Sequence, residues 1–97
     1  MEREERCRCI RYAADALASL ARAEAAMDAA YTFDAEGWLE IAEACGCISK
    51  PTLSKFKEEL RRIRDLIWSG KRDEARERLD DIEFEVEQLI EHLCKSS

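Results

Sequence analysis

Apolar side chains recur every three or four residues along most of the chain, which is the spacing of helices. The pattern is most regular in two C-terminal stretches, 51–68 and 72–94. The first stretch carries Leu53, Phe56, Leu60, Ile63 and Ile67. The second carries Ala75, Leu79, Ile82, Val86, Leu89 and Leu93. Because only a short link with Gly70 separates these stretches, we predict an antiparallel helical hairpin.

The N-terminal half predicts two further helices, over about 8–30 and 34–46. The first is rich in alanine, and its larger apolar residues follow one stripe: Ile10, Leu17, Leu20 and Met27. We expect a break within "YTFDAEG", where Thr32 or Asp34 would cap the second helix. Gly46 suits the left-handed conformation that ends many helices. The second helix is expected to bury Trp38, Ile41, Ala42 and Cys45.

These four helices predict an all-α, four-helix bundle-like fold in a single domain spanning residues 1–97. A composition that is 46% apolar and 39% charged, with one Pro, is too apolar for a disordered chain. No apolar run approaches the ~18 residues that span a bilayer. The N-terminal "MEREERCRCIR" lacks the apolar core of a signal peptide. We therefore expect a cytoplasmic protein that does not contact membranes.

Charge is unevenly distributed along a chain of net charge −6. Residues 49–72 have a local charge of +5, whereas 13–48 and 73–97 each have −6. An acidic total argues against general nucleic-acid binding. Pairing between a basic helix and its acidic neighbours accounts for the segregation most simply.

Five cysteines allow several interpretations. Folding the C-terminal hairpin about residues 70–71 places Cys94 level with Cys47, and His92 level with Ser49. The candidates for a disulfide or a metal site are therefore Cys45, Cys47, Cys94 and His92. Free packed thiols, a Cys47–Cys94 disulfide, a zinc or iron–sulfur site and a redox sensor all remain open. Folding the first two helices about residue 32 leaves Cys9 about 15 Å from this cluster.

The segment "IAEACGCISKPTLSKFKEEL" (41–60) resembles the helix-turn-helix unit of bacterial repressors. Ala42 precedes Gly46 by four residues, and Ser49, Thr52, Leu53 and Ser54 follow the pattern that opens the recognition helix, although the turn has one extra residue. The resemblance implies a helix that binds nucleic acid. Its contact residues would be Lys50, Thr52, Ser54, Lys55, Lys57, Arg61, Arg62 and Arg64.

Catalytic motifs are absent: the sequence has one His, no Gly-rich phosphate loop and no His-Glu-x-x-His. We therefore expect no enzyme and no cofactor, but a helical binding module that acts as an adaptor, regulator or inhibitor through a protein partner or a homodimer. Apolar residues outside the main seams and an acidic stripe suggest the binding residues: Trp68, Phe84, Ile90, Glu83, Glu87 and Glu91. In size and charge alone, the chain resembles small acidic viral proteins that block host nucleic-acid machinery.

Overall fold

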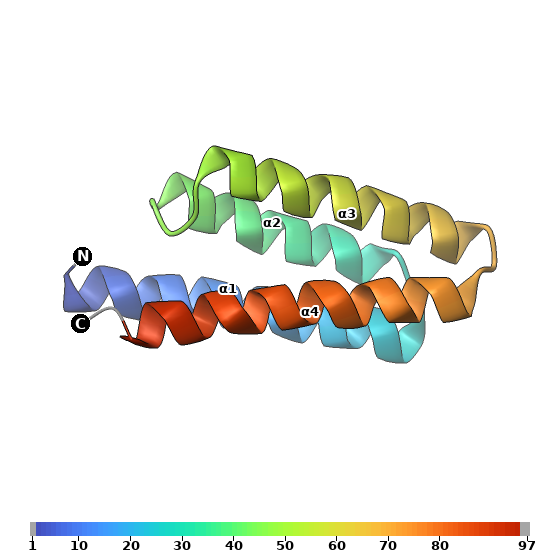
Figure 1. Ribbon diagram of the computed structural model, residues 1–97, viewed down its shortest axis with the longest axis horizontal. Coiled ribbons are helices and arrows are strands. Elements are labelled where there is room, and N and C mark those ends of the chain that lie inside the picture. Colours follow the sequence, from blue (N-terminus) through green and yellow to red (C-terminus); the bar gives the residue numbers. More distant parts are fainter. Residues whose placement is uncertain (1, 96–97) are drawn as a thin grey trace.

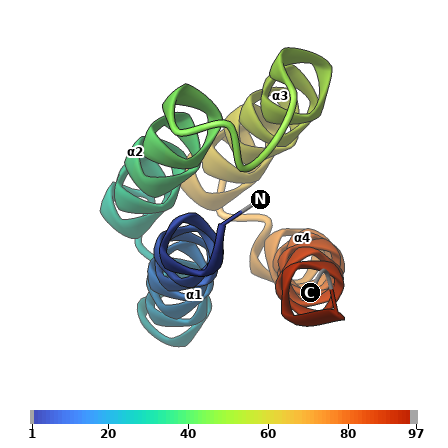
Figure 2. The same ribbon diagram turned by 90° about the vertical axis from the view of Figure 1, so that its left-hand side faces the viewer.

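The computed structural model describes residues 2–95, which form four helices (Figure 1). Their bounds are α1 Arg3–Ala26, α2 Ala30–Ala44, α3 Lys50–Trp68 and α4 Arg72–Lys95. Each helix runs antiparallel to the next, and α4 returns beside α1. An end-on view shows the helices at the four corners of the bundle (Figure 2). The predicted all-α, four-helix bundle fold is confirmed.

Local signals explain why α3 and α4 begin and end within one residue of the predicted positions. The Ser49 hydroxyl accepts a hydrogen bond from the Thr52 backbone N–H at 3.3 Å, and Pro51 lies in the first turn. Gly46 and Gly70 adopt left-handed φ angles of 79° and 76°. Both glycines thus end the preceding helix without the strain that a side chain would add.

The turn between α1 and α2 lies earlier than predicted. Helix α1 ends at Ala26, and Met27 takes the left-handed conformation with φ 50°. The Asp28 carboxylate accepts a hydrogen bond from the Ala30 N–H at 2.9 Å, so the first turn of α2 already has a capping residue. Thr32 is buried inside α2, where its hydroxyl donates to the Ala29 carbonyl. The prediction of a break within residues 31–37, capped by Thr32 or Asp34, is wrong.

The core lies along the bundle axis and combines large side chains from α3 and α4 with small ones from α1. The seams predicted for α3 and α4 face this core, although Leu53, Ile67 and Leu89 are only partly buried. On α1, Ala13, Ala16 and Ala23 are fully buried beside Leu20. Alanines at these positions let α2 and α4 approach α1 closely.

The face that α2 turns to the core differs from the predicted one. Leu39, Ala35 and Ala42 are buried, whereas Ile41 is 41% exposed and Cys45 is exposed. Apolar side chains cover most of the circumference of α2, so periodicity alone did not identify its buried face. The expectation that Ile41 and Cys45 pack in the core is wrong.

A buried cation joins α3 to α2. The Arg64 side chain donates to the Glu36 carboxylate at 3.2 Å and to the Thr32 hydroxyl at 3.5 Å. Its guanidinium also lies 4.2 Å from the centroid of the Phe33 ring. Because Arg64 is only 7% exposed, it is not available to contact a phosphate, contrary to the sequence prediction.

Within residues 2–95, no helix is both long enough and apolar enough to cross a bilayer.

Candidate functional site

The residues expected to bind nucleic acid all lie on α3, but they differ in burial and in the partners of their side chains. Lys57 lies 3.7 Å from Glu40 of α2, and Arg62 lies 3.8 Å from Glu58. Thr52 takes part in the helix cap with Ser49, while Arg64 is buried. The remaining predicted contact residues are exposed and form no ion pair among residues 2–95: Lys50, Ser54, Lys55 and Arg61.

The arrangement of α2 and α3 also differs from a helix-turn-helix unit. In that unit the recognition helix crosses its partner at a steep angle. Here α3 runs back alongside α2 (Figures 1 and 2), and its apolar seam is buried in the bundle. The architecture that the helix-turn-helix resemblance implies is therefore wrong, while nucleic-acid binding by the exposed lysines stays a prediction.

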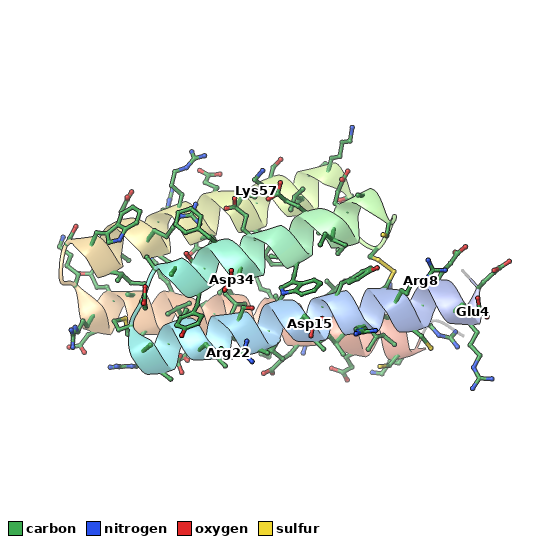
Figure 3. All side chains as sticks on the ribbon, turned by 180° about the vertical axis from the view of Figure 1, so that it is seen from behind. Glu4, Arg8, Asp15, Arg22, Asp34 and Lys57 are labelled. Atoms are coloured by element: carbon green, nitrogen blue, oxygen red, sulfur yellow. A yellow bond between two sulfur atoms is a disulfide. The ribbon has the colours of Figure 1, made fainter. Side chains whose placement is uncertain are left out.

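The cysteine pairing differs from the predicted one. Cys47, in the α2–α3 turn, forms a disulfide with Cys9 of α1, with Cα atoms 5.4 Å apart (Figure 3). The Cys47–Cys94 disulfide, one of the alternatives that the sequence left open, is therefore wrong. Cys7, Cys45 and Cys94 are exposed thiols, and His92 is also exposed on α4. The four residues proposed as one disulfide or metal site therefore do not form a cluster.

The outer side of α4 presents an aromatic ring among carboxylates. Phe84 is 61% exposed. Asp80 and Asp81 lie one helical turn before Phe84, and Glu87 lies one turn after it. Between positions 79 and 94 the chain has six carboxylates and neither Lys nor Arg. We call Asp80, Asp81, Phe84, Glu87 and Glu91 the acidic face of α4.

The other predicted binding residues lie elsewhere. Trp68 is 66% exposed at the end of α3, whereas Phe84 lies twelve residues, about 18 Å, along α4 from its start. The two rings therefore do not belong to one patch. Ile90 is partly buried and packs against the core, and its role in binding a partner stays a prediction. Glu91 is exposed and forms an ion pair with Lys95 at 3.1 Å.

Three carboxyl groups converge where α1 meets α4. An oxygen atom of each of Glu24, Asp80 and Glu83 lies within 4.8 Å of the others. A hydrogen bond with Asp80, partial burial and the charges of Glu83 and Asp80 raise the pKa of Glu24 from 4.5 to about 7. Burial, followed by the charge of Asp80, raises the pKa of Glu83.

This carboxyl cluster can share a proton near neutral pH, and within the described residues it is the group that could hold a cation. Its two helices are first and last in the chain, so the apolar pattern of neither helix predicts that these carboxyl groups meet. An acidic residue on the apolar stripe of α1 was the available signal.

A second candidate surface covers α1 and α2 (Figure 3). Its centre is a shallow hollow lined by Ser19, Arg22, Phe33, Asp34, Gly37, Trp38 and Ile41. Phe33 and Ile41 are 50% and 41% exposed, and a side chain added at Gly37 would meet open space. Trp38 stacks on Tyr12 of α1, with ring centroids 6.2 Å apart. We call this surface the α1/α2 face.

Comparison with protein-family models, curated proteins and solved structures yields no match for this chain.

Proposed function

We propose that this chain is a protein-binding module that acts by contact rather than by catalysis, and that the acidic face of α4 binds a basic segment of another protein. The observation that carries the proposal is the exposure of Phe84 at the centre of that face. A large exposed aromatic ring surrounded by polar groups is typical of an interaction site.

The chemistry of the face favours arginine-containing partners. A guanidinium can lie over the Phe84 ring while its N–H groups donate to Asp80 or Glu87. The aliphatic part of the same side chain would cover the apolar ring. Protein surfaces that bind nucleic-acid phosphates are rich in such arginine side chains. The partner class that we propose is therefore a nucleic-acid-binding protein.

The surplus of negative charge supports the same proposal. A hydrogen bond with Asp80, partial burial and the charges of Glu83 and Asp80 raise the pKa of Glu24 to about 7 despite the nearby Arg76, so the region retains a proton at neutral pH. A basic partner would relieve this repulsion and would also be attracted from a distance.

Fluorescence anisotropy with a labelled peptide of mixed Arg and Ala tests the proposal. We expect saturable binding that weakens as salt is added and weakens about tenfold for Phe84→Ala. Trp68→Ala is the matched control, because it removes an exposed ring from the end of α3. Equal affinities of the Phe84→Ala variant and the original chain would contradict the proposal. Binding to a DNA duplex in place of the peptide would favour the α3 lysines instead.

A further inference from the structure

The α1/α2 face combines an apolar centre with charges that form no ion pair among the described residues. Asp15 and Arg22 lie on this face (Figure 3), while Arg11 is exposed on the same helix and Asp28 is exposed in the turn that follows it. None of the four takes part in an ion pair among residues 2–95. The exposed residues Phe33 and Ile41 lie on the adjoining helix. The acidic face of α4 uses none of these residues, so this surface calls for a separate explanation.

The apolar positions on the outer side of α2 are symmetric about Gly37. Phe33 and Ile41 lie four residues on either side of it, and Ala30 and Ala44 lie seven residues on either side. If a second α2 lay antiparallel across Gly37, Phe33 of each copy would meet Ile41 of the other. Gly37 would lie at the crossing point, where the lack of a side chain permits close approach.

Four charges of α1 and of the turn after it are arranged so that each one on one side of a central level has an oppositely charged counterpart on the other side. Ser19 lines the same hollow as Gly37 and so marks the same level on α1. On either side of Ser19, Asp15 has Arg22 as its counterpart, and Arg11 has Asp28. A two-fold rotation about this level would therefore bring Asp15 of each copy to Arg22 of the other.

We propose that two copies of this chain associate through their α1/α2 faces, with corresponding helices antiparallel and the two-fold axis passing over Ser19 and Gly37. A surface that is complementary to itself in both shape and charge is the requirement for a two-fold interface. The occupant of the hollow is then Phe33 or Ile41 of the second copy.

One like-charged pair must be considered. The same rotation brings Glu40 toward Asp34 of the second copy. Glu40, however, is turned toward α3, where Lys57 lies 3.7 Å away and offsets its charge. The repulsion is therefore weaker than the sequence suggests, and the two Asp15–Arg22 pairs, whose charges have no such screening partner among the described residues, oppose it.

The size of the face is sufficient for a dimer. Helix α1 has 24 residues and is therefore about 36 Å long. The bundle measures 44 × 20 × 17 Å. One face thus offers on the order of 600 Å² from each copy, which reaches the lower bound of roughly 1,200 Å² for a stable interface.

Sedimentation equilibrium of the full chain tests the proposal. Cys7, Cys45 and Cys94 are replaced by Ser in every sample so that intermolecular disulfides cannot form. We expect a reversible monomer–dimer equilibrium at micromolar concentrations. Asp15→Arg or Arg22→Asp alone places like charges together twice, and should weaken the dimer about tenfold or more.

The charge-swap variant that combines Asp15→Arg with Arg22→Asp decides the question. It restores opposite charges across the two-fold axis, so we expect its dimer to be tighter than that of either single variant. Phe84→Glu, on α4, is the control and should leave dimerisation unchanged, with circular dichroism confirming the fold. A monomer at every concentration would overturn the proposal. A charge swap no tighter than the single variants, or an equal loss for Phe84→Glu, would also overturn it.

Discussion

Cys9 and Cys47 form a disulfide because the chain folds back at Asp28, which lies midway between them in sequence. The two cysteines are 38 residues apart, and α1 and α2 fold back on one another about that turn. Cys9 lies on the buried side of α1 at 1% exposure, while Cys7 lies on the exposed side. The disulfide thus fixes the α2–α3 turn to the N-terminal part of α1.

Removing this disulfide should lower the free energy of unfolding substantially. For a closed loop of this length, the chain-entropy model gives about 4 kcal/mol, a large share of a small domain's stability. Urea denaturation of the Cys47→Ala variant measures the loss. Cys94→Ala is the matched control and should change stability little, because Cys94 is an exposed thiol. An unchanged urea midpoint for Cys47→Ala would contradict the role of the disulfide.

The sequence left the state of the cysteines open, and it placed Cys9 away from Cys47 because one turn was predicted at the wrong position. A fold about residue 32 makes Cys45 level with Ser19, whereas a fold about Asp28 makes it level with Arg11. The difference of eight residues is about 12 Å along a helix, enough to place Cys9 beside Cys47. Thr32 or Asp34 was expected to cap the second helix, but both lie inside α2, and the Thr32 hydroxyl donates to the Ala29 carbonyl.

The C-terminal hairpin could be predicted because its signals agree with one another. The boundaries of α3 are marked by Ser49, Pro51 and Gly70. Helices α3 and α4 each have a regular apolar pattern along one side. Helix α2 lacks that asymmetry, so its exposed face could not be recognised from its sequence. The contact of Glu24 with Asp80 was equally inaccessible, because it depends on how α4 lies against α1.

Arg64 should be required for stability rather than for binding phosphate. Arg64→Ala leaves Glu36 mostly buried without its cation and removes the contact with Phe33. We expect a loss of about 3 kcal/mol in the free energy of unfolding, as is common when one partner of a buried ion pair is removed. Chemical denaturation measures this loss.

Arg61→Ala is the control for this prediction, since Arg61 is exposed one turn earlier on the same helix. It should change stability by less than about 0.5 kcal/mol. If Arg64→Ala and Arg61→Ala were equally stable, the buried contacts of Arg64 would contribute little.

Glu24 should make the protein less stable as the pH rises toward neutrality. Folding raises its pKa from 4.5 to about 7, so between these values the folded chain holds a proton that the unfolded chain has released. The contribution of this group to the free energy of unfolding therefore falls as pH rises through that range. After allowance for solvent screening at a partly exposed site, the change is on the order of 1 kcal/mol.

Glu24→Gln isolates this effect. Glutamine keeps the shape of a protonated carboxyl group and does not ionise, so we expect the variant to be more stable than the original chain at pH 8 and similar at pH 4.5. Thermal unfolding over this pH range measures the difference. Glu74→Gln, in the first turn of α4 away from the cluster, is the control. A difference that does not depend on pH would show that Glu24 acts through packing alone.

Binding of a basic partner to the acidic face of α4 should release a proton from the carboxyl cluster. Positive charge beside Asp80 and Glu87 would lower the pKa of Glu24, which is half-protonated near pH 7. Affinity for the Arg-containing peptide should therefore increase between pH 6 and pH 8, because less binding energy is used to expel the proton. Calorimetry in two buffers with different ionisation enthalpies measures the released proton directly. Glu24→Gln should abolish the difference between buffers while retaining binding, and a difference that persists in this variant would place the proton on another group.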